Sequence, residues 1–307
     1  MNILERMDAV HWTFSAIFGV LLIGEIAAAR IGGKELKARI RSWWVIVTLL
    51  AVGLLTHYTT GIVLFAFISF LAFKEYLSLI PTRRADRRVL FWAYLAIPLQ
   101  YWLVYTKWYG MFVILIPVYF FLLLPFRAVI IGETKGFLSS VATIQWGLMT
   151  TVFSIGHVAY LLALDIKKVA WNGTGVGMVL FIILLTELND VAQFVWGKSL
   201  GRHKIIPKVS PNKTVEGFLG GMFTTAVIAR LLAPHLTPLS ADHAWILGVI
   251  LPGLGFIGDV TISAIKRDIG VKDSGSIIPG HGGILDRIDS LTYTAPVFFH
   301  FVRYFYG

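Results

Sequence analysis

Long apolar stretches alternate with short polar connections along the whole chain. A membrane-spanning helix needs about 20 mostly apolar residues, and ten stretches approach or reach that length. They cover residues 9–29, 43–57, 61–80, 89–105, 109–125, 138–164, 176–197, 215–233, 244–265 and 289–306. This pattern predicts an all-α, polytopic integral membrane protein with about ten transmembrane helices.

The second and third of these stretches leave an alternative open. Only the polar patch Thr56, His57, Tyr58, Thr59 and Thr60 separates them. If the two stretches formed one broken helix, the chain would have nine spans. Everything before the break would then face the opposite side of the membrane.

Composition supports the membrane class and excludes several others. Of the 307 residues, 57% are hydrophobic and 14% are charged, whereas an ordinary soluble domain is roughly 45–50% apolar and about 25% charged. A soluble globule and a disordered chain are therefore excluded. Cysteine is absent, which excludes disulfides, a thiolate metal site and a cysteine nucleophile.

The basic residues are distributed unevenly between the two sides of the ten-helix layout. The chain has 27 Lys and Arg against 17 Asp and Glu. All but six of the 27 fall on one side; the six are Arg6, Lys107, Lys167, Lys168, Arg230 and Arg303. The positive-inside rule assigns the richer side to the cytoplasm. Our expectation for localisation is the bacterial inner (cell) membrane, with this basic side facing the cytoplasm.

The chain changes in character near residue 165. Residues 1–165 consist of predicted helices joined by short basic loops, and we treat them as an N-terminal transmembrane region. Residues 166–307 add the polar segments 198–214 and 266–288, and acidic residues enter the neighbouring helices. We expect this C-terminal region to carry the chemistry, in loops on the cytoplasmic side.

Four acidic residues lie within the predicted spans: Glu25, Glu187, Asp190 and Asp259. Charges in such positions are costly and commonly functional. One interpretation is pairing with a nearby Lys or Arg at the membrane interface, which we favour for Glu25. Asp190 and Asp259 instead lie at similar depth beside basic loops, an arrangement that favours a metal–phosphate site.

The segment 198–217 has features of a phosphate-binding loop. Ser210 followed by Pro211 predicts a helix N-cap with proline in the first helical position, and a helix N-terminus attracts anions. Lys213 and Thr214 would add a charge and a hydroxyl donor there. The alternative is a positive-inside loop with an ordinary helix cap.

The segment 258–289 combines groups suited to a cation and to phosphate. Asp259, Ser263 and Lys266 share one helix face at spacings of four and three. The run 279–283 is rich in glycine and can bring backbone N–H groups close to a ligand. Asp286 and Asp289 follow, and carboxylates with phosphate oxygens are the ligands that Mg²⁺ prefers.

This segment closely resembles the signature of the phosphatidate cytidylyltransferases, also called CDP-diacylglycerol synthases. The matching residues are Ser263, Lys266, Arg267, Lys272, Asp273, Pro279, His281, Gly282, Gly283, Asp286, Arg287 and Asp289. A second block of the family resembles Asp190, Ser210, Pro211, Lys213, Thr214, Glu216 and Gly217. The resemblance covers about the last 120 residues.

The resemblance implies an enzyme that transfers CMP from CTP to phosphatidic acid, giving CDP-diacylglycerol and pyrophosphate. It implies Mg²⁺ bound by Asp259 and Asp286, with or without a second cation, and a homodimer. We expect catalytic roles for Asp259, Asp286, Lys266 and Arg267. The expected substrate-binding residues are Ser210, Asn212, Lys213, Thr214, Ser263, Lys272, Asp273, His281, Gly282, Gly283, Arg287 and Asp190.

Two departures from the family pattern bear on the lipid acceptor. Many members carry Glu where this chain has Ile262, and a Ser-Gly-Ala-Tyr run where it has residues 191–194, Val-Ala-Gln-Phe. The alternatives are a cytidylyltransferase or CTP-dependent kinase that acts on an isoprenoid-type lipid, and a lipid transporter without catalysis. Against a transporter, the polar groups gather on one side and we find no inverted repeat.

Two further motifs have simpler explanations. Gly253, Gly255 and Gly258 match the G-x-G-x-x-G dinucleotide pattern, but they lie within a predicted span, where small residues allow close helix packing. Gly217, Gly220 and Gly221 have the same interpretation. The basic loops are short and dispersed, so we expect no nucleic-acid partner.

Overall fold

A computed structural model describes residues 8–31, 33–81, 83, 86–171 and 173–307. Within these ranges the secondary structure is helical, with two isolated β-bridges and no strand. The predicted all-α class is therefore confirmed. The basic residues Arg6 and Arg84 lie outside the described residues.

The N-terminal region contains the first eight α-helices and two π-helical segments. These are α1 (Ala9–Ile31), α2 (Lys34–Thr56), α3 (Tyr58–Leu79), α4 (Arg87–Tyr105), α5 (Tyr109–Ile114), η3 (Leu115–Phe120), α6 (Phe121–Ile131), α7 (Phe137–Leu148), η4 (Met149–Phe153) and α8 (Ser154–Ala163). The C-terminal region contains α9 (Gly175–Leu200), α10 (Val215–Leu236), α11 (Ala241–Asp268), α12 (Leu285–Ile288) and α13 (Leu291–Tyr306). The π-helical segments join their neighbours into two continuous helices, 109–131 and 137–163.

Eight helices within the described part of the chain are long and apolar enough to span a membrane. This corrects the predicted ten. The stretches 89–105 and 289–306 do form helices, as α4 and α13. However, α13 has only 16 residues, and α4 includes Arg87, Arg88 and Gln100, which lower its hydropathy.

The nine-span alternative for the second and third stretches is excluded. Helix α2 ends at Thr56 and α3 begins at Tyr58, and the extended backbone of His57 separates them. The imidazole of His57 accepts a hydrogen bond from the backbone N–H of Thr59, which caps α3. The Thr60 hydroxyl then donates to the Gly53 carbonyl at 2.8 Å and fixes the two helices against each other.

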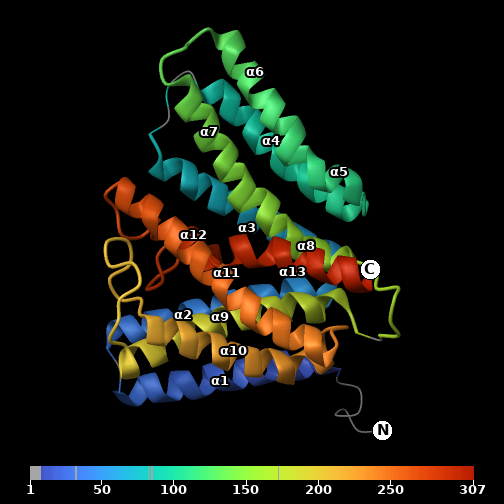
Figure 1. The fold of residues 1–307 in the computed structure, drawn as a ribbon, viewed down its shortest axis with the longest axis vertical. Coiled ribbons are helices and arrows are strands. Elements are labelled where there is room, and N and C mark those ends of the chain that lie inside the picture. The colour runs from blue at the N-terminus through green and yellow to red at the C-terminus, as the bar shows by residue number, and fades with distance from the viewer. Residues whose placement is uncertain (1–7, 32, 82, 84–85, 172) are drawn as a thin grey trace.

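The loops that hold most of the basic residues gather at one end of the helices, on the left in Figure 1. There the Ser42 hydroxyl donates to the Pro279 carbonyl, and Arg267 donates to the Val209 carbonyl. At the other end, Lys107 pairs with Asp165 at 2.9 Å. The two-sided layout is thus present in the structure, and the assignment of the basic end to the cytoplasm stays a prediction of the positive-inside rule.

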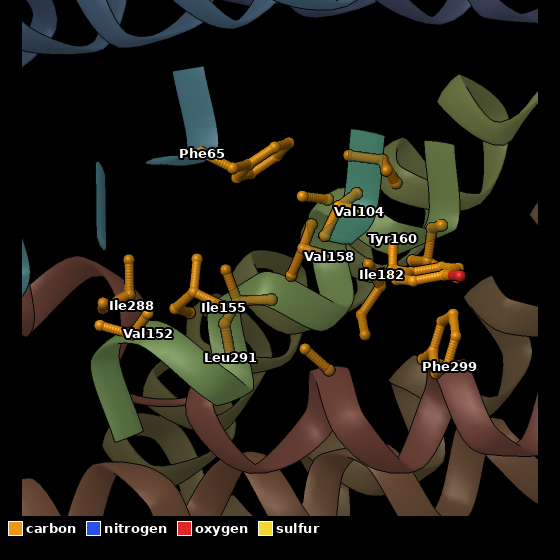
Figure 2. Close-up of a cluster of buried hydrophobic side chains, with 14 of the residues drawn as sticks. Phe65, Val104, Val152, Ile155, Val158, Tyr160, Ile182, Ile288, Leu291 and Phe299 are labelled. Carbon is orange, nitrogen blue, oxygen red and sulfur yellow. The ribbon is translucent and has the colours of Figure 1, made fainter. Parts of the chain in front are cut away.

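A buried apolar core joins the two halves of the chain. In Figure 2, Ile155 and Val158 of α8 lie between Phe65 of α3, Ile182 of α9 and Leu291 at the start of α13. All five side chains are buried. Because α8 touches helices from both regions, the N-terminal helices support the C-terminal ones that carry the predicted site.

Glycines allow the helices of the C-terminal region to approach closely. A Cβ on Gly221 of α10 would clash with Gln193 of α9, and one on Gly258 of α11 would clash with the Asp289 carbonyl. Gly253 has nothing nearby. The G-x-G-x-x-G match therefore lies inside one helix, and its last glycine provides a packing contact.

We predict different effects of alanine on the stability of the protein at two glycines of α11. A Cβ at position 248 would lie 2.6 Å from the Ala226 Cα, so Gly248→Ala should destabilise the α10–α11 contact by about 1–3 kcal/mol. Gly253→Ala meets open space and should be neutral or stabilising by up to ~1 kcal/mol. Melting in detergent, followed by tryptophan fluorescence, measures both. Equal destabilisation by the two variants would contradict this packing.

Candidate active site

The predicted site residues come together at the basic end of the bundle. They are supplied by α9, by the loop 201–214, by the last turns of α11 and by the segment 269–290. Two ammonium–carboxylate pairs form the centre of the site. One joins the loop before α10 to α11, and the other lies within the segment 258–289.

The first pair joins the loop before α10 to α11. The Lys213 ammonium lies 2.7 Å from Asp259 Oδ2, and the two side chains are 19% and 23% exposed. The Ser263 hydroxyl donates to Asp259 Oδ1 at 3.2 Å. Lys213 also donates to Gln193 Oε1 of α9 at 3.3 Å. This pair is partly open, so a ligand can reach it.

The second pair is more deeply buried. The Lys266 ammonium lies 2.6 Å from Asp286 Oδ1, and both side chains are about 10% exposed or less. Asp286 Oδ2 accepts backbone hydrogen bonds from Ser274 at 2.9 Å and Gly283 at 3.2 Å. Burial alone would raise the pKa of the Asp286 carboxyl, but the hydrogen bonds from Lys266 and the two amides lower it below its ordinary value. Asp286 is therefore ionised at neutral pH.

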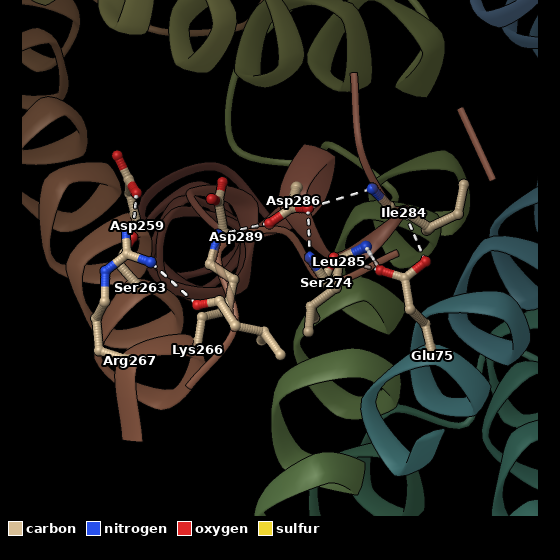
Figure 3. A network of polar contacts seen from close by, with 12 residues as sticks. Glu75, Asp259, Ser263, Lys266, Arg267, Ser274, Ile284, Leu285, Asp286 and Asp289 are labelled. Carbon is tan, nitrogen blue, oxygen red and sulfur yellow. Dashed lines mark hydrogen bonds and ion pairs between the residues drawn. The ribbon is translucent and has the colours of Figure 1, made fainter. Parts of the chain in front are cut away.

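A buried acid that we did not predict holds the glycine-rich loop in place. Glu75 of α3 is 5% exposed and accepts hydrogen bonds from the backbone N–H groups of Ile284 at 2.9 Å and Leu285 at 3.0 Å. It also accepts one from the Ser274 hydroxyl. Figure 3 shows this carboxylate directed at the loop that carries Asp286. The N-terminal region thus contributes directly to the geometry of the site.

The sequence did contain a signal for Glu75. It is a single acid near the end of the apolar stretch 61–80, comparable with the four acids that we singled out. Its actual partners are backbone N–H groups about 200 residues later in the chain, and no local pattern identifies those.

The turn around Asp286 depends on two glycines. Gly282 has a φ of +83°, a region that L side chains rarely adopt, and its Cβ would lie 2.7 Å from Asp286 Oδ2. A Cβ on Gly283 would clash with Glu75. The glycines thus make room for two carboxylates, and the loop's N–H groups are directed at protein oxygens.

Two more acids lie beside the first pair. The Ser290 hydroxyl donates to Asp190 Oδ2 at 3.4 Å, and the Ser290 amide donates to Asp289 Oδ1 at 2.7 Å. Asp190, Asp259 and Asp289 are close enough to repel one another. Oxygen Oδ1 of Asp190 is buried with no hydrogen-bond donor within the described part of the chain. Three carboxyl groups therefore lie near the single ammonium group of Lys213, and burial together with the charges of Asp259 and Asp190 raises the pKa of Asp289.

The predicted helix cap at Ser210 is wrong by four residues. Helix α10 begins at Val215, and Thr214 is its N-cap, accepting a hydrogen bond from the Gly217 amide at 3.1 Å. Ser210 lies in the preceding turn, where its carbonyl accepts from the Lys213 amide. An antiparallel bridge between Lys204 and Thr214 keeps this stretch extended, which delays the start of the helix.

The other predicted residues occupy the edges of the site. Arg267 donates to the carbonyls of Val209 and Val271 and joins the two loops. Asn212, Lys272 and Asp273 are exposed. His281 packs edge-on against Trp43, with ring centroids 5.7 Å apart.

Arg287 is close enough to Glu187 and Asp190 to interact with both. Its Nε is buried with no acceptor among the described residues, as is Nδ1 of His281. Burial, followed by the charges of Arg287 and Arg39, lowers the pKa of His281. A neutral imidazole at pH 7 follows from that direction.

The donor set fits a cation that arrives with a phosphate ligand. In the described ranges, no group of three or more His, Asp or Glu has a geometry that could hold a metal. Mg²⁺ commonly uses one or two carboxylates and completes its shell with water and substrate phosphates. The partly exposed Asp259 and the unpartnered oxygen of Asp190 are oxygen ligands of this kind. Asp286 can offer its Oδ1 to a cation only when the Lys266 ammonium leaves it.

Comparisons with known proteins identify the family of the chain. Residues 37–305 match the model of the cytidylyltransferase family. The chain is 47% identical over 272 residues to the uncharacterized protein YnbB of Escherichia coli K12, which covers 89% of each chain.

Named enzymes also match over part of the chain. Identity is 37% over 155 residues to a phosphatidate cytidylyltransferase of Staphylococcus aureus, covering 50% of this chain and 59% of that enzyme. The enzyme of Staphylococcus saprophyticus gives 37% over 159 residues, again with 59% of its length covered. With the family model spanning most of the sequence, the chain belongs to the cytidylyltransferase family.

Proposed function

We propose that the protein transfers CMP from CTP to phosphatidic acid, giving CDP-diacylglycerol and pyrophosphate. The observation that carries this proposal is the pair of ammonium–carboxylate contacts, Lys213 with Asp259 and Lys266 with Asp286, at the basic end of a membrane bundle. The ammonium groups can bind phosphates, and the carboxylates can bind the accompanying cation. Phosphatidic acid as acceptor is supported by the similarity to the two staphylococcal phosphatidate cytidylyltransferases.

The reaction would be an in-line displacement at the α-phosphorus of CTP. A phosphate oxygen of the lipid forms the new O–P bond, and the bond to the β-phosphate oxygen breaks as pyrophosphate leaves. The attacking oxygen is already anionic, so the site needs no strong general base. Catalysis then depends on positioning and on neutralising charge.

The residues of the two pairs would exchange partners when substrate binds. Asp259 and Asp286 would hold Mg²⁺, which acts as a Lewis acid on phosphoryl oxygens when bound. Lys213 and Lys266, released from the carboxylates, would neutralise the triphosphate, and Ser263 would donate to a phosphate oxygen. Because Lys213 and Asp259 are partly exposed whereas Lys266 and Asp286 are buried, we expect the first pair to open first.

The location of the site suits both substrates. CTP is soluble, and the phosphate of the lipid lies at the membrane surface. The site is at the end of the bundle that the positive-inside rule assigns to the cytoplasm. We therefore propose a bacterial inner-membrane enzyme with its site facing the cytoplasm.

A different lipid phosphate is the second candidate acceptor. The departure from the family pattern at residues 191–194 reaches the site, because Gln193 contacts Lys213. Val191 and Phe194 are exposed on α9, where they would face lipid. An isoprenoid-type phosphate would use the same phosphate-binding groups with a different apolar chain.

The direct test is incorporation of labelled CMP from CTP into added phosphatidic acid by the purified full chain. We expect incorporation that requires Mg²⁺ and stops when the cation is chelated. A panel of isoprenoid phosphates and lipid alcohols in parallel identifies the acceptor. Absence of incorporation into every lipid phosphate would contradict a cytidylyltransferase function and favour the transporter alternative.

Asp259→Asn should reduce the rate of CMP transfer by at least ~100-fold, because the site loses a carboxylate that would bind the cation beside the reacting phosphates. The amide keeps the size of the side chain, so the protein should elute from size exclusion as the parent does. Asp242→Asn is the matched control, since Asp242 lies in the first turn of the same helix at the far end. Near-parental activity of Asp259→Asn would exclude this role.

Glu75→Gln should lower the rate of CMP transfer. Glu75 is a positioning residue, which acts on the reaction through the loop that it holds. The amide replaces one carboxylate oxygen with a donor, which leaves a loop N–H without an acceptor and shifts Ser274 and Asp286. A displacement of about 1 Å can lower a rate by roughly 100-fold. We expect a lower kcat and a higher Mg²⁺ requirement, measured well below the melting midpoint of the variant.

Glu25→Gln is the control for Glu75→Gln, because Glu25 is an exposed acid of another membrane helix. It should leave kcat, the Mg²⁺ requirement and the melting midpoint unchanged. If Glu75→Gln lowered only the melting midpoint and left the Mg²⁺ requirement as in the parent, its role would be structural alone.

A further inference from the structure

A cavity lies at the end of the bundle opposite the candidate active site. It has a volume of about 810 Å³ and opens to the surface, a size typical of ligand sites. Its lining residues are Tyr109, Lys168, His300, Arg303, Tyr304, Phe305 and Gly307. None of these residues takes part in the proposed reaction.

Basic residues are scarce at this end, and their concentration here is therefore informative. Only six of the 27 Lys and Arg fall on this side of the predicted layout. Lys168 and Arg303 line the cavity, and the adjacent Lys167 donates its backbone N–H to the Tyr306 carbonyl. The positive-inside rule disfavours basic residues on the far side of the membrane. Three of the six basic residues assigned to that side, Lys167, Lys168 and Arg303, nevertheless lie in or beside the lining of this one cavity.

The cationic groups are held by aromatic rings and carbonyls. The Arg303 guanidinium carbon lies 3.5 Å from the centroid of the Tyr109 ring. Lys168 donates to the Tyr304 carbonyl and lies 5.9 Å from the centroid of its ring. Within the described residues, neither cation forms an ion pair with a carboxylate. By contrast Lys107, at the same end, pairs with Asp165.

Hydrogen-bond donors and apolar surface complete the cavity. The Tyr109 hydroxyl and Nδ1 of His300 are 3.3 Å apart, and both belong to residues of the lining. Tyr304 is 73% exposed and Phe305 is 41% exposed. Aromatic residues with this placement are typical of the membrane–water interface, where a ligand presents both a charged group and apolar chains.

We propose that this cavity binds the phosphate of an anionic phospholipid headgroup at the membrane face opposite the active site. Arg303 and Lys168 would bind the phosphate oxygens, as guanidinium and ammonium groups commonly do. Tyr304 and Phe305 would pack against the glycerol and the first acyl carbons. The proposal does not depend on the proposed enzymatic function, and its test needs no activity measurement.

The test is native mass spectrometry of the full chain in detergent, with added phosphatidylglycerol or with phosphatidylcholine of the same acyl chains. We expect bound phosphatidylglycerol on the parent and about tenfold weaker binding to the double variant Lys168→Gln, Arg303→Gln. The single variant Arg303→Lys should keep most of the binding seen with the parent, because it keeps the positive charge. Lys107→Gln, which removes a paired lysine outside the cavity, should bind as the parent does.

Three results would overturn the proposal. One is equal binding of phosphatidylglycerol by the parent and the double variant. Another is equally tight binding of phosphatidylcholine. The third is displacement of the lipid by inorganic phosphate at equal concentration, which would identify a free anion as the ligand. If the double variant fails to fold, Lys168→Gln alone decides, since this exposed side chain should weaken binding without affecting the melting midpoint.

Discussion

The geometry of the site depends on buried carboxylates that accept hydrogen bonds from the segment 274–285. Asp286 accepts from the Ser274 and Gly283 amides, and Glu75 accepts from the Ile284 and Leu285 amides. A buried N–H without an acceptor costs about 1–3 kcal/mol, so these contacts determine the path of the loop. That path brings Asp286 to Lys266. The close approach of Gly258 to the Asp289 carbonyl holds the start of α13 against α11, the helix that carries Asp259.

Most of the fold could be predicted because membrane helices can be recognised from the hydropathy of the sequence alone. In lipid every backbone polar group must be satisfied within the segment, which leaves few structures for a chain of this composition. The count of spans was less predictable. Helix α13 is short and α4 carries arginines, and a hydropathy pattern does not separate a short buried helix from a span.

The candidate site was predictable where residue order carries the chemistry. The acids and basic residues of 258–289 are close in sequence, and the spacing of Asp259 and Ser263 places them in contact on one helix face. Contacts between distant segments were not predictable. Neither the pairing of Lys213 with Asp259 nor the support from Glu75 has a local signature. The cap at Thr214 was missed because Ser210–Pro211 is an equally good local signal, and a bridge to Lys204 decides between them.

The central claim is that the two ammonium–carboxylate pairs form the place where a triphosphate and its cation bind. A structure of the chain in lipid with CTP and Mg²⁺ tests this most directly. We expect phosphate density between Lys213 and Lys266, with the Lys213–Asp259 contact lengthened beyond its present 2.7 Å and a cation beside Asp259. Nucleotide bound elsewhere, with both pairs intact, would contradict it.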